Sequence, residues 1–203
     1  MKLYTGMGPN PRVVTLFVAE RGAQVDLETV DLMAGENREQ AHLARNPAGQ
    51  LPTLELDDGR CIAEITAICE YLDEKTPGDS LIGSTPEERA ETRMWVRRID
   101  LNVCENLANG FRFAEGLPLF ENRLRCIPQA ADDLKAITQE KLAWIDDLME
   151  GREFICGDRF TLADILLFAF LEFGGAVGQP LDAKCERLQA WYARIAARPS
   201  VAG

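Results

Sequence analysis

The sequence contains very little that could hold a metal or exchange disulfides. It has a single histidine, His42, and six cysteines, none of which forms a Cys-x-x-Cys pair. A zinc site is therefore not expected, and a dithiol redox centre would lack its second thiol. No run of about 18 apolar residues is present, which argues against a membrane-spanning helix. In a chain of this kind the cysteines are predicted to be reduced and mostly buried, as in a cytoplasmic protein.

Positive charge is also scarce. Lysine and arginine together number 22 against 33 acidic residues, so the formal net charge is −11 and the pI about 4.7. This balance argues against nucleic acids and anionic membrane surfaces as partners, because both need clustered cations. A small anion could still bind at a helix N-terminus or beside a single arginine.

The chain divides into two regions of different character. Residues 1–75 mix strand and helix patterns, whereas residues 85–203 show helix patterns only. A stretch rich in proline, glycine and serine at 74–80 is the best linker candidate. We therefore expect one domain at 1–78 and a second at 84–203.

Within the first region the elements alternate. The patterns predict a sheet of α/β type containing a hairpin at Asp57-Asp58-Gly59. Strands are expected at 2–4, 25–32, 51–56 and 60–63, helices at 12–21 and 66–74, and a loop at 6–11.

The second region is expected to be all-helical. Helices are predicted from Pro86 to about 108 and over about 130–149, the latter with Leu134, Ile137, Ile145 and Leu148 on one face. The clearest helix start is Phe160-Thr-Leu-Ala-Asp-Ile165, where Thr161 can cap the helix and Asp164 can complete a capping box. The apolar run 165–171 predicts a helix buried on all sides.

An ordered set of motifs carries a family resemblance. The segment Asn46-Pro-Ala-Gly-Gln-Leu-Pro-Thr-Leu54 is followed by Asp58-Gly59, then by Ala63-Glu-Ile-Thr-Ala-Ile68 and Tyr71-Leu72, and finally by the helix start at 160–164. Together these resemble a cytosolic glutathione transferase, most closely an atypical fungal and bacterial branch that lacks the fixed tyrosine, serine or cysteine catalyst.

The resemblance implies a fold and a chemistry. It implies a thioredoxin-like N-terminal domain with the order β-α-β-α-β-β-α, an all-α C-terminal domain, and a cytoplasmic homodimer active in detoxification. Reduced glutathione would be the co-substrate, with no metal, and would bind the N-terminal domain. A small hydrophobic electrophile would lie between the two domains.

The resemblance also assigns glutathione-binding residues. A cis bond before Pro52 would turn the N–H and C=O of Leu51 outward to pair with the ligand backbone, as a sheet edge does. Glu64 would accept the ligand ammonium at a helix entrance, and the backbone N–H of Ile65 would hold a carboxylate in place of the usual serine. The further candidates are Thr66, Gln50 and Arg38.

Activation of the thiol is the open question. A free thiol has a pKa near 8.5, so a transferase must stabilise the thiolate. Gly8 occupies the usual serine or threonine position. Asn10 is the first candidate donor to the sulfur, and the alternatives are Tyr4, Thr5, or a bound water beside the N-terminus of the following helix.

The electrophile site is expected at Met7 and at the end of the long helix and its loop, at Asn109, Arg112 and Phe113. Three functions remain open at this stage. The first is conjugation of glutathione to small hydrophobic electrophiles. The alternatives are a glutathione-dependent disulfide or peroxide reductase and a non-catalytic module that binds glutathione or a protein partner.

Overall fold

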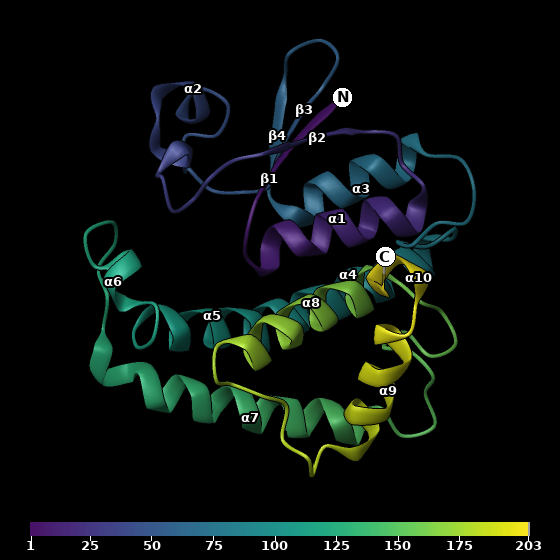
Figure 1. Cartoon of the computed structure of the whole chain (residues 1–203). Coiled ribbons are helices and arrows are strands. Elements are labelled where there is room, and N and C mark those ends of the chain that lie inside the picture. The colour runs from purple at the N-terminus through teal and green to yellow at the C-terminus, as the bar shows by residue number, and fades with distance from the viewer. Residues whose placement is uncertain (203) are drawn as a thin grey trace. The chain divides into compact units, whose positions relative to one another are not determined.

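The computed structural model describes residues 1–202, and the chain separates between Ser84 and Thr85 into two compact units. The first unit has a thioredoxin-like arrangement of strands and helices, and the second is helical. Both features agree with the fold class expected from the sequence (Figure 1).

The first unit contains one four-stranded sheet. The strand order is β2-β1-β3-β4, with β1 parallel to β2 and antiparallel to β3, and β3 antiparallel to β4. The elements are β1 (Lys2–Thr5), α1 (Pro9–Arg21), β2 (Asp26–Thr29), a 3₁₀ turn (Glu36–Arg38), α2 (Gln40–Leu43), β3 (Thr53–Glu55), β4 (Cys61–Ala63) and α3 (Ile65–Lys75).

The core of this unit lies between the sheet and the helices α1 and α3. These two helices run side by side, while α2 stands apart from both (Figure 1). Leu3 and Leu54 face each other across β1 and β3 and are fully buried. Phe17 on α1 and Leu72 on α3 are also fully buried. Each such side chain contributes about 1.5–3 kcal/mol by leaving water, so this layer fixes the sheet against its two helices.

The loop expected at 6–11 is shorter than predicted, because α1 already begins at Pro9. Pro9 and Pro11 both lie in the first turn of the helix. Proline is tolerated there because the N–H groups of a first turn have no intrahelical partner. The expected helix end is confirmed: Gly22 closes α1 with φ of 64°.

A buried arginine joins the ends of the two core helices. The Nε of Arg21 lies 2.8 Å from Oδ1 of Asp73, and both side chains are more than nine-tenths buried. The guanidinium also donates to the carbonyl oxygens of Asp73, Thr76 and Asp79. Hydrogen bonds to several carbonyls offset the cost of burying this charge.

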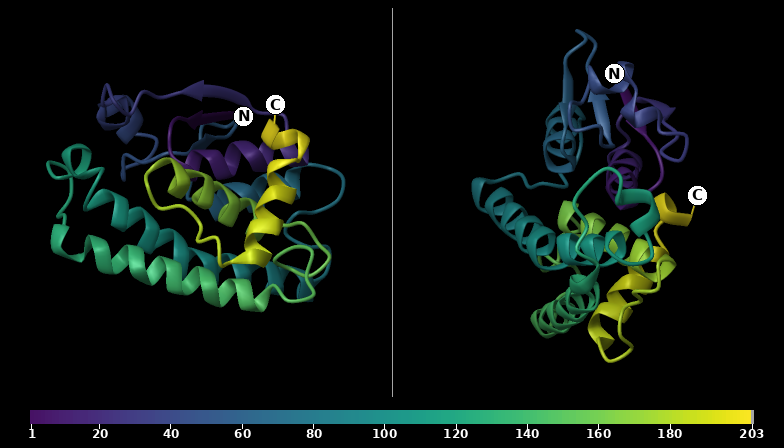
Figure 2. Two further views of the ribbon diagram at one scale, coloured as in Figure 1. Left: turned by 60° about the horizontal axis from the view of Figure 1, so that its bottom comes forward. Right: turned by 90° about the vertical axis from the view of Figure 1, so that its left-hand side faces the viewer.

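The second unit consists of helices packed in pairs. Within it α5 packs along α7 and α4 along α8, while α9 contacts both α7 and α8 (Figure 2). The elements are α4 (Pro86–Ile99), a π-helical stretch (Asp100–Cys104), α5 (Glu105–Arg112), α6 (Leu117–Phe120), a 3₁₀ turn (Pro128–Ala130), α7 (Ala131–Leu148), α8 (Leu162–Ala176), α9 (Glu186–Ala196) and α10 (Pro199–Ala202). No helix within residues 1–202 is both long and apolar enough to cross a membrane.

The predicted capping box of α8 is confirmed. The Thr161 hydroxyl accepts from the Ala163 N–H, and Asp164 Oδ2 accepts from the Thr161 N–H at 2.9 Å. Asp164 also accepts from the N–H of Ile155 and from the indole of Trp191, both at 2.9 Å. The run 165–171 is at most 4% exposed, as expected.

The predicted face of α7 is partly wrong. Ile137 is 37% exposed, whereas the buried face runs through Thr138, Leu142 and Ile145. The apolar pattern alone did not identify Thr138, which satisfies its hydroxyl by donating to the Leu134 carbonyl at 2.9 Å.

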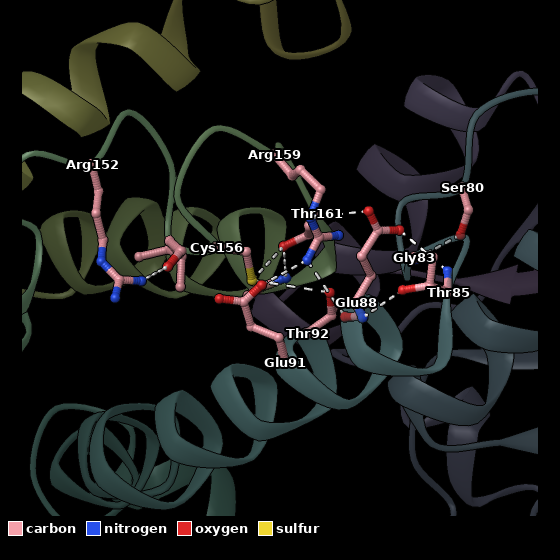
Figure 3. A network of polar contacts seen from close by, with 12 residues as sticks. Ser80, Gly83, Thr85, Glu88, Glu91, Thr92, Arg152, Cys156, Arg159 and Thr161 are labelled. Atoms are coloured by element: carbon pink, nitrogen blue, oxygen red, sulfur yellow. Dashed lines mark hydrogen bonds and ion pairs between the residues drawn. The ribbon is translucent and has the colours of Figure 1, made fainter.

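A polar cluster joins α4 to the segment before α8 (Figure 3). Arg159 lies between Glu88 and Glu91 of α4, with Nη2 2.9 Å from Oε2 of Glu91. Beside it, the Thr161 hydroxyl lies 3.5 Å from Sγ of the buried Cys156. Cys156 is buried, and burial raises the pKa of its thiol, which disfavours the reactive thiolate. All six cysteines are free, and four are buried.

Candidate functional site

The bond between Leu51 and Pro52 is cis, as the sequence motif predicts. Within residues 1–202 neither the amide N–H nor the carbonyl of Leu51 has a hydrogen-bond partner, although the residue is 7% exposed. Buried backbone groups are nearly always paired, so an unpaired segment directly before a strand can accept a peptide ligand.

The sheet register brings the predicted acid next to this segment. Thr53 of β3 pairs with Ala63 of β4 in the antiparallel ladder. Residues just beyond such a pair face each other, so Pro52 and Glu64 lie across from one another. Two parts of the motif that are separated in sequence therefore meet at one edge.

Glu64 has an unusual backbone. Its φ is 70° and its ψ 124°, and among residues 1–202 it is the sole non-glycine residue with positive φ. Strained conformations of this kind cost about 1–3 kcal/mol and concentrate at functional sites. The side chain is exposed and makes no capping bond to the helix. Its carboxylate is therefore available to a cation.

The first turn of α3 supplies backbone donors beside Glu64. Ile65 and Thr66 occupy its first two positions, and the first helical bond runs from the Ile68 N–H to the Glu64 carbonyl at 3.0 Å. The N–H groups of Ile65 and Thr66 thus remain directed out of the helix end, where they favour an anion. The N-cap position belongs to Glu64, so Thr66 lies inside the first turn of the helix.

Arg38 and Gln50 are both exposed, and the Arg38 guanidinium lies beside Gly49, the residue before Gln50. Asn37 donates from Nδ2 to the Gly49 carbonyl at 2.6 Å. A Cβ atom on Gly49 would lie 3.0 Å from Nη1 of Arg38, and φ at Gly49 is +60°. This position therefore requires glycine, and it sets the Arg38 guanidinium beside the residue that precedes Gln50.

Of the candidate groups for the thiol, Tyr4 is unsuitable. It is 3% exposed, and its hydroxyl donates to Oε2 of Glu55 at 2.8 Å. Burial raises the pKa of Tyr4, and the bond to Glu55 raises it further. The Arg45 guanidinium covers the ring at 4.3 Å from its centroid. Tyr4 is thus a core residue with its hydroxyl already engaged. Thr5 ends β1 and is 8% exposed.

Asn10 has a different setting. It is the second residue of α1 and is partly buried. Its side-chain amide has no hydrogen-bond partner within residues 1–202. The helix end around it is poor in donors, since the flanking Pro9 and Pro11 have no N–H. The side-chain amide of Asn10 therefore adds to the few donors available at this end of α1.

The residues proposed for the electrophile belong to both units. Met7 is 61% exposed in the first unit. Asn109 and Arg112 lie in the second unit on α5, and Phe113 follows it. The single helix predicted from Pro86 to about 108 is wrong, because the structure has α4, a π-helical stretch and then α5, which continues to Arg112. Arg112 donates from Nη1 to Oδ1 of Asn109 at 3.0 Å, and its guanidinium lies 5.8 Å from the ring centroid of Phe120.

Two family models match this chain, one over each of its two parts. The model of the glutathione S-transferase N-terminal domain matches residues 1–74, and that of the C-terminal domain matches residues 117–199. The chain belongs to the glutathione S-transferase family.

Individual relatives span nearly the whole chain. Glutathione S-transferase 2 of Saccharomyces cerevisiae is 34% identical over 97% of this chain and 85% of its own length. Glutathione S-transferase GstA of Escherichia coli O157:H7 is 32% identical over 99% of this chain and 95% of its own. A solved glutathione S-transferase domain-containing protein of Marinobacter aquaeolei VT8 superposes with a TM-score of 0.93 at 39% identity, covering 99% of this chain and 100% of that one.

Proposed function

We propose that this protein is a transferase that conjugates reduced glutathione to small hydrophobic electrophiles. The observation that carries the proposal is the meeting of two free groups at one edge: the unpaired backbone of Leu51 and the exposed carboxylate of Glu64. An extended tripeptide with an ammonium at one end needs both a strand edge and an acid beside it.

Each binding residue contacts a different group of the glutathione molecule. Glu64 accepts the ammonium, and the N–H groups of Ile65 and Thr66 hold the neighbouring γ-glutamyl carboxylate at the positive end of α3. Leu51, ahead of Pro52, pairs with the cysteinyl backbone. Gln50 contacts the ligand main chain, and Arg38, whose guanidinium lies beside Gly49, pairs with the glycine carboxylate.

Asn10 is the residue proposed to activate the thiol. Its side-chain amide would donate to the sulfur and favour the thiolate, which attacks the electrophilic carbon and expels a halide or opens an epoxide. The substrate-binding residues are then Met7, Asn109, Arg112 and Phe113. The arginine would favour an apolar electrophile that carries a negative group.

Measuring the turnover of glutathione with model electrophiles tests this proposal. The wild-type protein should conjugate glutathione to aryl halides, epoxides or isothiocyanates above the uncatalysed rate. Asn10→Ala should lower kcat by about 100- to 1,000-fold, the range for loss of one stabilising donor. Tyr4→Phe is the matched control, because the Tyr4 hydroxyl already donates a hydrogen bond to Glu55. This variant should keep the wild-type kcat.

The rival functions give different results in the same experiment. Activity confined to disulfides or hydroperoxides would indicate that the protein is a glutathione-dependent reductase and not a transferase. Binding of glutathione without turnover in any assay would indicate a non-catalytic module. The proposal also includes a cytoplasmic homodimer, for which sedimentation should give twice the 22.6 kDa chain mass.

A further inference from the structure

The carbonyl of Gln50, just before the ligand-binding edge, is held by three side chains. His42 Nε2 lies 3.0 Å from the carbonyl oxygen, Asn46 Nδ2 lies 3.0 Å from it, and Thr53 Oγ1 lies 3.4 Å from it. A carbonyl oxygen only accepts hydrogen bonds, so His42 donates from Nε2. His42 is 3% exposed, and its Nδ1 is buried without a partner among residues 1–202.

The peptide between Gln50 and Leu51 transmits this restraint. The cis bond lies one residue later, so this peptide is trans, and its C=O and N–H point in opposite directions in one plane. Side chains that hold the Gln50 carbonyl on the inner side therefore direct the Leu51 N–H to the outer side. That N–H is the group left unpaired in the structure.

His42 is positioned by more than this bond. Its ring packs edge-on against Tyr4, with centroids 6.4 Å apart and an interplanar angle of 81°. Tyr4 is itself held by Glu55, and Arg45 covers its ring. The His42 ring, which donates to Gln50, is therefore held against β1 by its edge-on contact with Tyr4.

We propose that His42 is a positioning residue for glutathione: it fixes the Gln50–Leu51 peptide plane so that the Leu51 N–H meets the cysteinyl carbonyl of the ligand. This proposal rests on the proposed function, since it concerns the same edge. His42 itself touches no ligand and acts through the backbone.

The experiment compares two ligands and three proteins by calorimetry. The ligands are glutathione and its trans-alkene isostere at the cysteinyl-glycine bond, which lacks that carbonyl. His42→Leu removes the donor, whereas His42→Gln places an amide N–H at the level of Nε2. Circular dichroism and thermal unfolding confirm that each variant is folded, and His42→Asn, whose amide is too short to reach Gln50, replaces His42→Leu if the latter does not fold.

Loss of the donor should raise the Kd of glutathione about 3- to 10-fold, as for one net hydrogen bond, and leave the Kd of the isostere within about twofold. His42→Gln should restore glutathione binding to within about twofold of wild type. In turnover, KM should rise while kcat at saturation stays within about twofold.

Two results would overturn the proposal. Equal weakening of both ligands would show a general structural role for His42, and unchanged binding of glutathione would show no role at all. Either result leaves the proposed function standing, because wild-type binding is measured alongside. Absence of glutathione binding to the wild type would instead remove the proposed function and this inference with it.

Discussion

Thr53 and Ala63 pair in the antiparallel ladder between β3 and β4, and this pairing places Pro52 across from Glu64. The register has a direct consequence for function. In the proposed function, a backbone edge and a carboxylate that are twelve residues apart in sequence would act on the same ligand, and a shift of one residue would turn them to opposite sides of the sheet.

The carboxylate of Glu64 should dominate recognition of the ligand ammonium. Glu64→Ala should raise the Kd of glutathione at least about 10-fold, since a charge-assisted hydrogen bond contributes about 1.5–3 kcal/mol. Calorimetry measures the change. Glu74→Ala, which removes an exposed carboxylate from the other end of α3, should bind like wild type. Equal effects of the two substitutions would point to net charge and not to a site.

The backbone of Glu64 predicts a conflict between stability and binding. At φ of 70° a side chain is strained and glycine is not. Glu64→Gly should therefore increase the free energy of unfolding by about 1 kcal/mol while it abolishes the ammonium contact. Chemical denaturation and calorimetry on the same preparation test both halves. A less stable glycine variant would show that the surrounding packing, and not strain, governs this position.

Arg112 should determine which electrophiles are preferred. Arg112→Gln should lower kcat/KM for a carboxylated aryl halide by about 10-fold and change it little for the neutral parent compound, because only the anion loses an ion pair. Arg97→Gln, which alters an exposed arginine on α4, is the control. Equal losses for the two substrates would assign Arg112 a packing role beside Phe120.

Asp164 should make the second unit sensitive to pH. Burial outweighs its hydrogen bonds and raises its pKa from 3.8 to about 6. The folded state thus holds this proton more tightly than the unfolded chain does. The stabilisation from proton binding is complete below about pH 3.8 and is lost as the pH rises through about 6.

The indole of Trp191 reports this titration, because its Nε1–H donates to Oδ1 of Asp164 at 2.9 Å. Its proton resonance should shift with a midpoint near pH 6, while that of the more exposed Trp144 stays constant. A Trp191 resonance that stays constant down to pH 4 would show that the hydrogen bonds donated to Asp164 outweigh burial.

Local patterns in the sequence predict much of this molecule. The Asp58-Gly59 turn, the capping box at Thr161 and the glycine stop at Gly22 each depend on a few adjacent residues, and all are present. The cis bond at Pro52 follows from the family motif, and not from the proline itself.

Features that depend on distant contacts could not be predicted. The helix predicted from Pro86 to about 108 is interrupted by a π-helical stretch at 100–104, which the composition does not indicate. Tyr4 remained a candidate for the thiol because its position in the chain fits. Only its contact with Glu55, which is 51 residues away, shows that its hydroxyl is engaged. The role proposed for His42 could not be predicted for a different reason: its partner is a backbone carbonyl, which the identity of the residue at position 50 does not reveal.

Amide chemical shifts during a titration with glutathione test the central claim most directly. The resonances of Leu51, Ile65 and Thr66 should move together along one saturable binding curve, and the Glu64→Ala variant should need a higher concentration for the same shifts. Binding that leaves these three amides unchanged, or moves residues elsewhere in the chain, would contradict the placement of the ligand at the edge formed by Leu51 and Glu64.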